Sequence, residues 1–346
     1  MGKTKDTFKK VFEVLFVDKK DENEKYRQAG LSALYRKELA DQIQSRRFLI
    51  VLLMIAVTGV ASVYSAGLGI QSTIQGSSSA AATGGSTFLS LFTTSGGTLP
   101  SFVSFLSFLG PIVGLAMGFD AINGERSRRT LTRLVSQPIY RDSVINGKFL
   151  AGLTVISIMV FSLGLIFGSM GVIMIGVPPS SDDLIRILLF LVYTTVYISL
   201  WLGISILFSL IFRHAATSAL SGISVWVFFS FFLSLLANVA AGAAYPVSDS
   251  STTDVVLNNY NFAEGINRIS PTTLYSESVS TILDPSVRTL GPVLNTQVDR
   301  AVVGPLPIDQ SLLLVWPHLV GLLAITLICF AISYVIFMRQ EIRTNS

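Results

Sequence analysis

SFVSFLSFLGPIVGLAMGF, residues Ser101–Phe119, is an apolar run without a single Asp, Glu, Lys or Arg. A run of about 20 apolar residues matches the thickness of the hydrocarbon core of a bilayer. A soluble helix of that length normally carries charges on the face that meets water. Five further runs share this character: Phe48–Leu68, Phe149–Val177, Ile187–Phe212, Ala215–Ala244 and Leu312–Met338. The sequence therefore predicts an all-α polytopic membrane protein with six transmembrane helices.

The basic residues are sorted between alternate sides of these spans. They gather before span one, between spans two and three, after span four and in the tail, at Lys25, Arg27, Arg36, Lys37, Arg46, Arg47, Arg126, Arg128, Arg129, Arg133, Arg141, Lys148, Arg213, Arg339 and Arg343. By contrast, residues 69–100 contain no Lys or Arg. Because loops rich in Lys and Arg stay in the cytoplasm, the pattern predicts that both termini are cytoplasmic.

The spans divide the chain into three parts. Residues 1–47 form a cytoplasmic tail with amphipathic segments: Leu31–Arg47 reads as an interfacial helix, and residues 1–29 as either a helix on the inner leaflet or a partly ordered tail. Residues 48–338 form the membrane domain, with a cytoplasmic loop at 120–148 and an outer loop at 242–311, and residues 339–346 form a cytoplasmic tail. The Gly- and Ser-rich loop Gly69–Pro100 is expected to be flexible.

Composition excludes several classes of function. Hydrophobic residues make up 51% and charged residues 13% of the 346-residue chain, which is typical of a multi-pass membrane protein. Its net charge of +4 is dispersed over the ends of loops, so nucleic acid is not an expected partner, whereas the lipid bilayer is. Cys329 has no partner for a disulfide, and His214 and His318 do not make a metal site by themselves. No phosphate-binding loop or hydrolase motif occurs, so we expect neither catalytic residues nor a cofactor in this chain. The spans also lack acidic residues that could relay ions. Energy for any transport would then come from a partner.

Two local patterns predict structure beyond the spans. Gly110, Gly114 and Gly118 recur every four residues in span two, which favours close packing against another helix near a transport pathway, although any apolar helix collects glycines. In the loop 242–311, Ser270-Pro271 is typical of a helix start, and Asp284-Pro285 would end that helix after Leu283.

The segment after span two carries the strongest clue to function. Asn123-Gly124 is expected to break the transmembrane helix, and Glu125–Val135 to form a short helix that Pro138 stops. The residues from 139 to Phe149, with a corner at Asn146-Gly147-Lys148, would lead into span three. The short helix has an apolar side and several arginines, so it either docks on a cytoplasmic protein or is an ordinary basic loop. The residues alone leave both open.

This segment resembles that of type-2 ABC-transporter permeases, of the branch that includes the nitrous-oxide-reductase maturation permease and drug- and sodium-exporter-like subunits. The family order of Asp, Glu-Arg, Thr-Leu, Pro, Arg and Gly-Lys is matched by Asp120, Glu125-Arg126, Thr130-Leu131, Pro138, Arg141 and Gly147-Lys148. The chain departs from the family at Arg129, where Gly is common. Arg268-Ile269-Ser270-Pro271 resembles the element before the family's last span.

The resemblance implies a permease subunit, not itself catalytic, that exports a substrate from a prokaryotic cell across the plasma membrane. A separate ATP-binding subunit would bind ATP and Mg²⁺, and a second permease chain, identical or related, would complete the transporter. Asp120 would lie at the cytoplasmic mouth. The contact with the ATP-binding subunit would involve Glu125, Arg126, Arg128, Arg129, Thr130, Leu131 and Leu134. Two other interpretations stay open: a membrane-anchored scaffold that holds an extracellular partner on Gly242–Ser311, and a channel or carrier that needs no ATP.

Overall fold

The computed structural model describes residues 30–76, 87–95, 99–127, 140–176, 178–248, 251–287, 290 and 306–340. The regular structure within these ranges is helical throughout, without a strand. Six helices are long and apolar enough to cross a membrane, as predicted. They are α2 (Arg46–Gly76), α4 (Phe102–Gly118), α7 (Arg141–Ile175), α8 (Ser181–Ile211), the run α9 (Ala215–Val227), η2 (Phe228–Phe232) and α10 (Leu233–Ala244), and α14 (Ile308–Arg339). A further helix over residues 30–43 leads to α2.

Several helices extend beyond their apolar runs, because hydropathy reports the apolar length and not the helix end. α7 begins at Arg141, so the expected corner at Asn146-Gly147-Lys148 is wrong and the helix is continuous there. α8 begins at Ser181, behind a capping box in which Ser180 and Asp183 bond each other's backbone N–H groups. Such reciprocal bonds satisfy the donors of the first helical turn.

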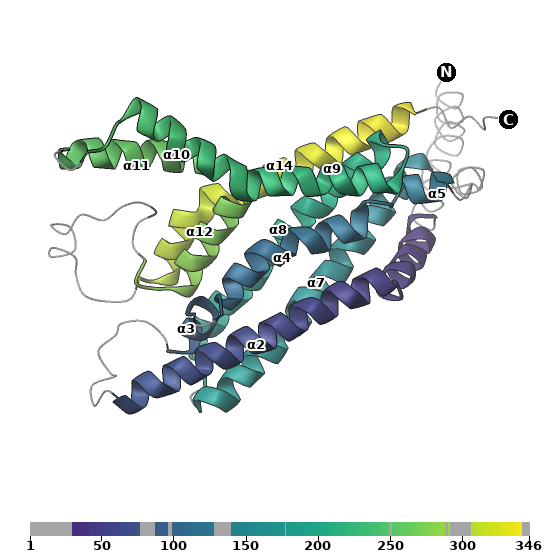
Figure 1. Cartoon of the computed structure of the whole chain (residues 1–346). Helices are drawn as coiled ribbons and strands as arrows, with labels where there is room; N and C mark the ends of the chain where they lie inside the picture. The colour runs from purple at the N-terminus through teal and green to yellow at the C-terminus, as the bar shows by residue number, and fades with distance from the viewer. Residues whose placement is uncertain are drawn as a thin grey trace, which may run out of the picture.

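α8 lies at the centre of the bundle. It contacts α4, α7, α9, α12 and α14, and it is the most buried of the six spans, whereas α9–α10 and α14 are the least buried. α2 packs on α4 and α7. α2, α4, α7 and α8 slant together, while α9 and α10 leave the bundle at an angle (Figure 1). The exposed apolar side chains of α2, α9, α10 and α14 suit a lipid environment.

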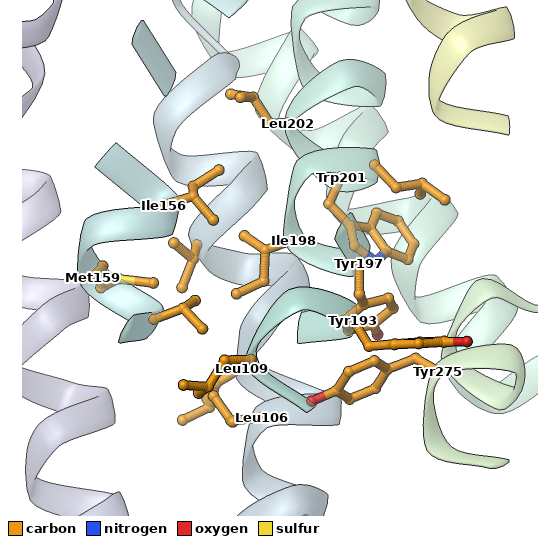
Figure 2. Close-up of a cluster of buried hydrophobic side chains, with 14 of the residues drawn as sticks. Leu106, Leu109, Ile156, Met159, Tyr193, Tyr197, Ile198, Trp201, Leu202 and Tyr275 are labelled. Carbon is orange, nitrogen blue, oxygen red and sulfur yellow. The ribbon is translucent and has the colours of Figure 1, made fainter. Parts of the chain in front are cut away.

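The core is built around the middle of α8. Leu106 and Leu109 of α4 lie on one side of Ile198, and the aromatic rings of α8 point the other way, toward α12 (Figure 2). Tyr197 stacks on Tyr275 with a distance of 4.2 Å between ring centroids. Both rings are fully buried, so α12 is part of the core.

The segment Gly69–Pro100 is more ordered than expected. α2 continues to Gly76, and α3 (Thr87–Thr93) buries Phe88, Leu89, Leu91 and Phe92. Phe92 packs on Phe102 and Phe190 at about 6 Å between centroids. The expectation of a flexible loop is therefore wrong for α3, because a short apolar stretch lies within a Gly- and Ser-rich region. Residues 77–86 lie outside the described part of the chain.

The loop 242–311 contains α11 (Thr253–Asn267) and α12 (Pro271–Leu283). The predicted start of α12 is confirmed: Ser270 caps it through Thr272, Pro271 follows, and Asp284 ends it. Its position between spans was not predicted. α12 packs on α4, α8 and α14, and Ser270 Oγ donates to the carbonyl of Phe229 in η2 at 3.0 Å. The loop thus folds back between the spans.

Candidate functional site: a charged junction at the basic end

One end of the bundle collects the basic residues, and we call it the basic end. The helix over residues 30–43, α5 (Asn123–Ser127) and one end of each span meet there. The described basic residues at this end are Arg36, Lys37, Arg46, Arg47, Arg126, Arg141, Lys148, Arg213 and Arg339. Folding therefore brings together charges that are far apart in the sequence.

α4 ends one turn before the predicted break. Phe119–Ile122 form the turn, and Asn123-Gly124 begin α5 rather than interrupt a helix. The backbone N–H groups of Ile122 and Asn123 donate to Ser209 Oγ of α8 at 2.9 and 3.1 Å. This side-chain cap satisfies donors that a polar loop would normally leave to water. The start of α5 is therefore fixed on the central span.

A cluster of four charged residues holds α5 to its neighbours, and we call it the lysine cluster: Lys37, Glu38, Glu125 and Lys148. Lys148 of α7 has only 4% of its side chain exposed, and its Nζ lies 2.9 Å from Glu125 and 3.0 Å from Glu38. Lys37 adds a second ammonium at 3.0 Å from Glu38 and 3.7 Å from Glu125. The cluster joins three elements: the helix over 30–43, α5 and α7.

The opposite charges of the lysine cluster stabilise one another in their ionised forms. Burial alone would raise the pKa of Glu38, but the ammonium groups of Lys148 and Lys37 outweigh it and hold that pKa below the usual value. Burial alone would lower the pKa of Lys37, but the hydrogen bond and the charge of Glu38 outweigh it and raise that pKa above the usual value. Glu38 thus stays ionised at neutral pH. Removing one member of such a buried set leaves an uncompensated charge.

A second set of contacts ties the basic end across the bundle. Arg47 pairs with Asp120 at 2.5 Å and its guanidinium lies over the ring of Phe119. Arg126 of α5 donates to Gln340 Oε1 at 2.7 Å, directly after α14. Gln340 in turn donates to the carbonyl of Leu210 in α8 at 3.1 Å. α5 is therefore bonded to α7, α8 and the end of α14.

The predicted coupling residues are only partly described. Glu125 and Arg126 lie in α5, and Asp120 lies in the turn before it. Arg128, Arg129, Thr130, Leu131 and Leu134 lie outside the described residues, so their contact with another subunit stays a prediction. Glu125 points into the lysine cluster, with 15% of its side chain exposed.

The motif residues converge although they are widely spaced. Asp120, Glu125, Arg126, Arg141 and Lys148 all make contacts at the basic end. Sequence reasoning missed their partners Glu38, Ser209 and Gln340. No local pattern marks these residues as partners, because each pair comes from separate elements.

The glycines of span two face the central span. A Cβ added to Gly114 would lie 2.6 Å from the carbonyl oxygen of Ile198, and one added to Gly118 would lie 2.7 Å from Ser205 Cβ. Gly110 is less tight, at 3.2 Å from Ile198. α4 and α8 thus approach to backbone contact at Gly114. A role in a transport pathway stays a prediction.

The basic end is built from ion pairs and side-chain hydrogen bonds between elements. The described residues contain no group of three or more His, Cys, Asp and Glu placed to hold a metal ion. The short helix α5 is bonded there to α7, α8 and the residue after α14.

A family model described as "ABC-2 family transporter protein" matches residues 32–342. The chain therefore belongs to this family, as the resemblance indicated, and is an ABC transporter permease with six membrane-spanning helices. Permease subunits of this kind are generally not catalytic.

Two curated relatives carry the name "Probable ABC transporter permease protein NosY". The protein from Pseudomonas aeruginosa is 32% identical over 115 residues, which is 33% of this chain and 36% of the relative. The one from Stutzerimonas stutzeri is 34% identical over 114 residues, 33% of this chain and 35% of the relative. The match covers about a third of each curated relative.

Proposed function

We propose that the chain is the membrane subunit of an ATP-driven exporter and that a separate ATP-binding subunit docks at the basic end. The observation that carries this proposal is the lysine cluster, which bonds α5 to the helix over 30–43 and to α7. α5 leads directly into the segment that resembles the family's coupling helix. ATP and Mg²⁺ would be bound in the partner.

The contacts at the basic end suggest how the two subunits are coupled. Closure of the ATP-binding subunits would push the segment after Ser127, and α5 would move with it. Lys148 would pass this movement to α7, and Arg126 with Gln340 would pass it to α14 and α8. Because packed helices shift as rigid bodies, the result would be a switch between discrete states of the spans.

Orientation and assembly belong to the same proposal. The spatial sorting of Lys and Arg supports a cytoplasmic basic end in a prokaryotic plasma membrane, with both termini inside and the loop at 242–311 facing outward. A second permease chain, the same or related, would complete the pathway. The exposed apolar side chains of α2, α9 and α10 would be available for contact with this second chain.

Affinity purification of the tagged full-length chain, followed by reconstitution in nanodiscs, tests this function. We expect an ATP-binding subunit to co-purify and to hydrolyse ATP. The double substitution Leu131→Asp and Leu134→Asp should release that subunit, because charges would replace the apolar side of the short helix that the sequence predicts over Glu125–Val135. The matched control, Val247→Asp with Val256→Asp, places the same charges on exposed apolar positions at the opposite end and should leave the complex intact.

Two outcomes would contradict this proposal. Transport that persists without any co-purifying ATPase would favour a channel or carrier. An ATPase that binds the doubly substituted chain as tightly as the native chain would show that the segment is not the docking site.

A further inference from the structure

A buried arginine lies at the end of the bundle opposite the basic end, and the function proposed above does not use it. Arg186, in the second turn of α8, has only 1% of its side chain exposed. A guanidinium stays charged at every physiological pH, and burying it is costly unless its N–H groups find acceptors. Because charged residues buried in a span generally serve a function, the partners of Arg186 indicate what that function is.

The acceptors around Arg186 come from three parts of the chain. Its Nε donates to Asp182 Oδ2, on the same helix, at 2.8 Å. Its Nη1 donates to the carbonyl of Ile282 in α12 at 2.8 Å and to Ser311 Oγ in α14 at 3.3 Å. Its Nη2 donates to the carbonyl of Leu306 at 2.5 Å. One side chain of α8 therefore binds the end of α12 and the start of α14.

The two carbonyls that Arg186 binds lie where the chain leaves α12 and where it returns to α14. α12 ends at Leu283, and the last carbonyls of a helix have no donor within the helix itself. A cation beside them is also favoured by the helix dipole. Leu306 lies two residues before α14, and its backbone N–H donates to the carbonyl of Pro285 at 2.8 Å. The guanidinium thus fixes both ends of the connection between the two helices.

Other contacts hold the start and the middle of α12. Ser270 bonds a carbonyl of η2, and the hydroxyl groups of Tyr275 and Thr194 lie 2.9 Å apart. In the middle, Glu277 lies 2.6 Å from His318 of α14. All of these contacts use side chains of residues 270–277, whereas Arg186 binds the backbone of the last turn. It therefore fixes the position of that turn directly.

We propose that Arg186 is a lock that keeps α12 seated between α4, α8 and α14. While the guanidinium binds the carbonyls of Ile282 and Leu306, the last turn of α12 stays on α8. When these bonds break, both carbonyls can bond to water, and α12 leaves its seat from this end. A lysine at position 186 would keep the charge, but its single ammonium could not serve acceptors that are spread around a planar fork.

This lock goes beyond ATP-driven transport and does not depend on it, so the experiment reads structure rather than activity. The full-length chain in nanodiscs carries a reporter, Val279→Cys, in a Cys329→Ser background. The control reporter is Ile145→Cys in α7, at the basic end; both native side chains are 0% exposed. The rate of modification by a charged, water-soluble thiol reagent is measured for each reporter. A buried thiol reacts only when the structure around it opens.

We expect Arg186→Met to raise the rate at position 279 at least about tenfold, because it removes several hydrogen bonds from a charged group and keeps the apolar stem. The rate at position 145 should not change. Arg186→Lys should give an intermediate rate at position 279. The matched control Asp182→Asn should stay within about twofold of the native rate, since Asp182 is half exposed and lies on α8 itself.

An unchanged rate at position 279 in Arg186→Met would overturn the proposal. A rise of the same size in Asp182→Asn would also overturn it, because the ion pair within α8 would then matter and not the bonds to α12. If Arg186→Met does not fold, Arg186→Lys decides. A rise confined to position 279 supports the lock, whereas equal rises at positions 279 and 145 contradict it.

Discussion

Lys148 is the residue on which the basic end depends. Its ammonium is almost fully buried between Glu38 and Glu125, and both carboxylates come from elements that are otherwise separate. Lys37 meets the same carboxylates from the surface, with half of its side chain exposed. Two lysines therefore make similar contacts in very different surroundings, and the difference in burial should decide how much each contributes.

Lys148→Met should lower the stability of the purified chain by about 3–5 kcal/mol, because it removes the buried cation and leaves Glu38 and Glu125 only the half-exposed ammonium of Lys37. Lys37→Met should cost only about 0–1 kcal/mol, as for other exposed ion pairs. Thermal unfolding in one detergent, with both variants side by side, measures this. Equal shifts for the two variants would mean that burial at Lys148 does not matter.

At the scale of elements, α4 packs on α8 with its backbone against the α8 backbone at Gly114. Gly114 brings the backbone of α4 against the carbonyl of Ile198, where a side chain has no space. Gly168 of α7 offers the opposite case, since an added Cβ would meet nothing within 4 Å. The two glycines lie in similarly apolar helices and differ mainly in what surrounds them.

Gly114→Leu should therefore destabilise the folded chain, whereas Gly168→Leu should leave its stability nearly unchanged. The larger side chain at position 114 would push α4 away from α8, and lipid tails supply no compensating hydrophobic driving force for repacking. Size-exclusion profiles and thermal unfolding of the two purified variants provide the comparison. A stable, monodisperse Gly114→Leu variant would show that this close approach is dispensable.

Different elements were predictable to different degrees, for physical reasons. Apolar runs mark spans directly, and Ser270-Pro271 marks the start of α12 because capping is local. The burial of α12 was not predictable, since its Ser and Thr residues resemble those of an exposed loop. In the structure, the hydroxyl groups of Ser278 and Thr281 donate hydrogen bonds to carbonyls of their own helix. Both side chains can therefore be buried without an unsatisfied donor. The pairing of Glu38 with Lys148 has no local signal at all.

At the scale of the whole molecule, the two ends of the bundle differ in the charged residues that they carry. The basic end holds the lysine cluster, and the opposite end holds most of the described acidic residues of the outer loop, Asp254, Glu264, Glu277 and Asp284. This division is what the retention of cationic loops in the cytoplasm would produce. It implies one orientation in the membrane, which single cysteines can report.

Cysteines at Val247 and Gln44, introduced one at a time with Cys329→Ser, should differ in accessibility. Val247 lies after α10 at the opposite end, and Gln44 lies between the helix over 30–43 and α2. A thiol reagent that does not cross membranes should label position 247 in intact cells and position 44 only after lysis. Labelling of position 44 in sealed cells would reverse the orientation.

The central claim is that movement of α5 reaches the spans through its bonds at the basic end. The most direct measurement is ATP hydrolysis by the reconstituted complex after Arg126→Cys and Gln340→Cys are joined by a short, reducible bifunctional thiol cross-linker, in a Cys329→Ser background. The native side chains meet at 2.7 Å, so the cross-link would hold α5 to the end of α14. We predict that hydrolysis falls to the level of the ATP-binding subunit alone when the cross-link forms and returns to its level before cross-linking on reduction, whereas hydrolysis by the complex with Arg126→Cys alone does not change on treatment with the cross-linker. Undiminished hydrolysis by the fully cross-linked complex would contradict the account.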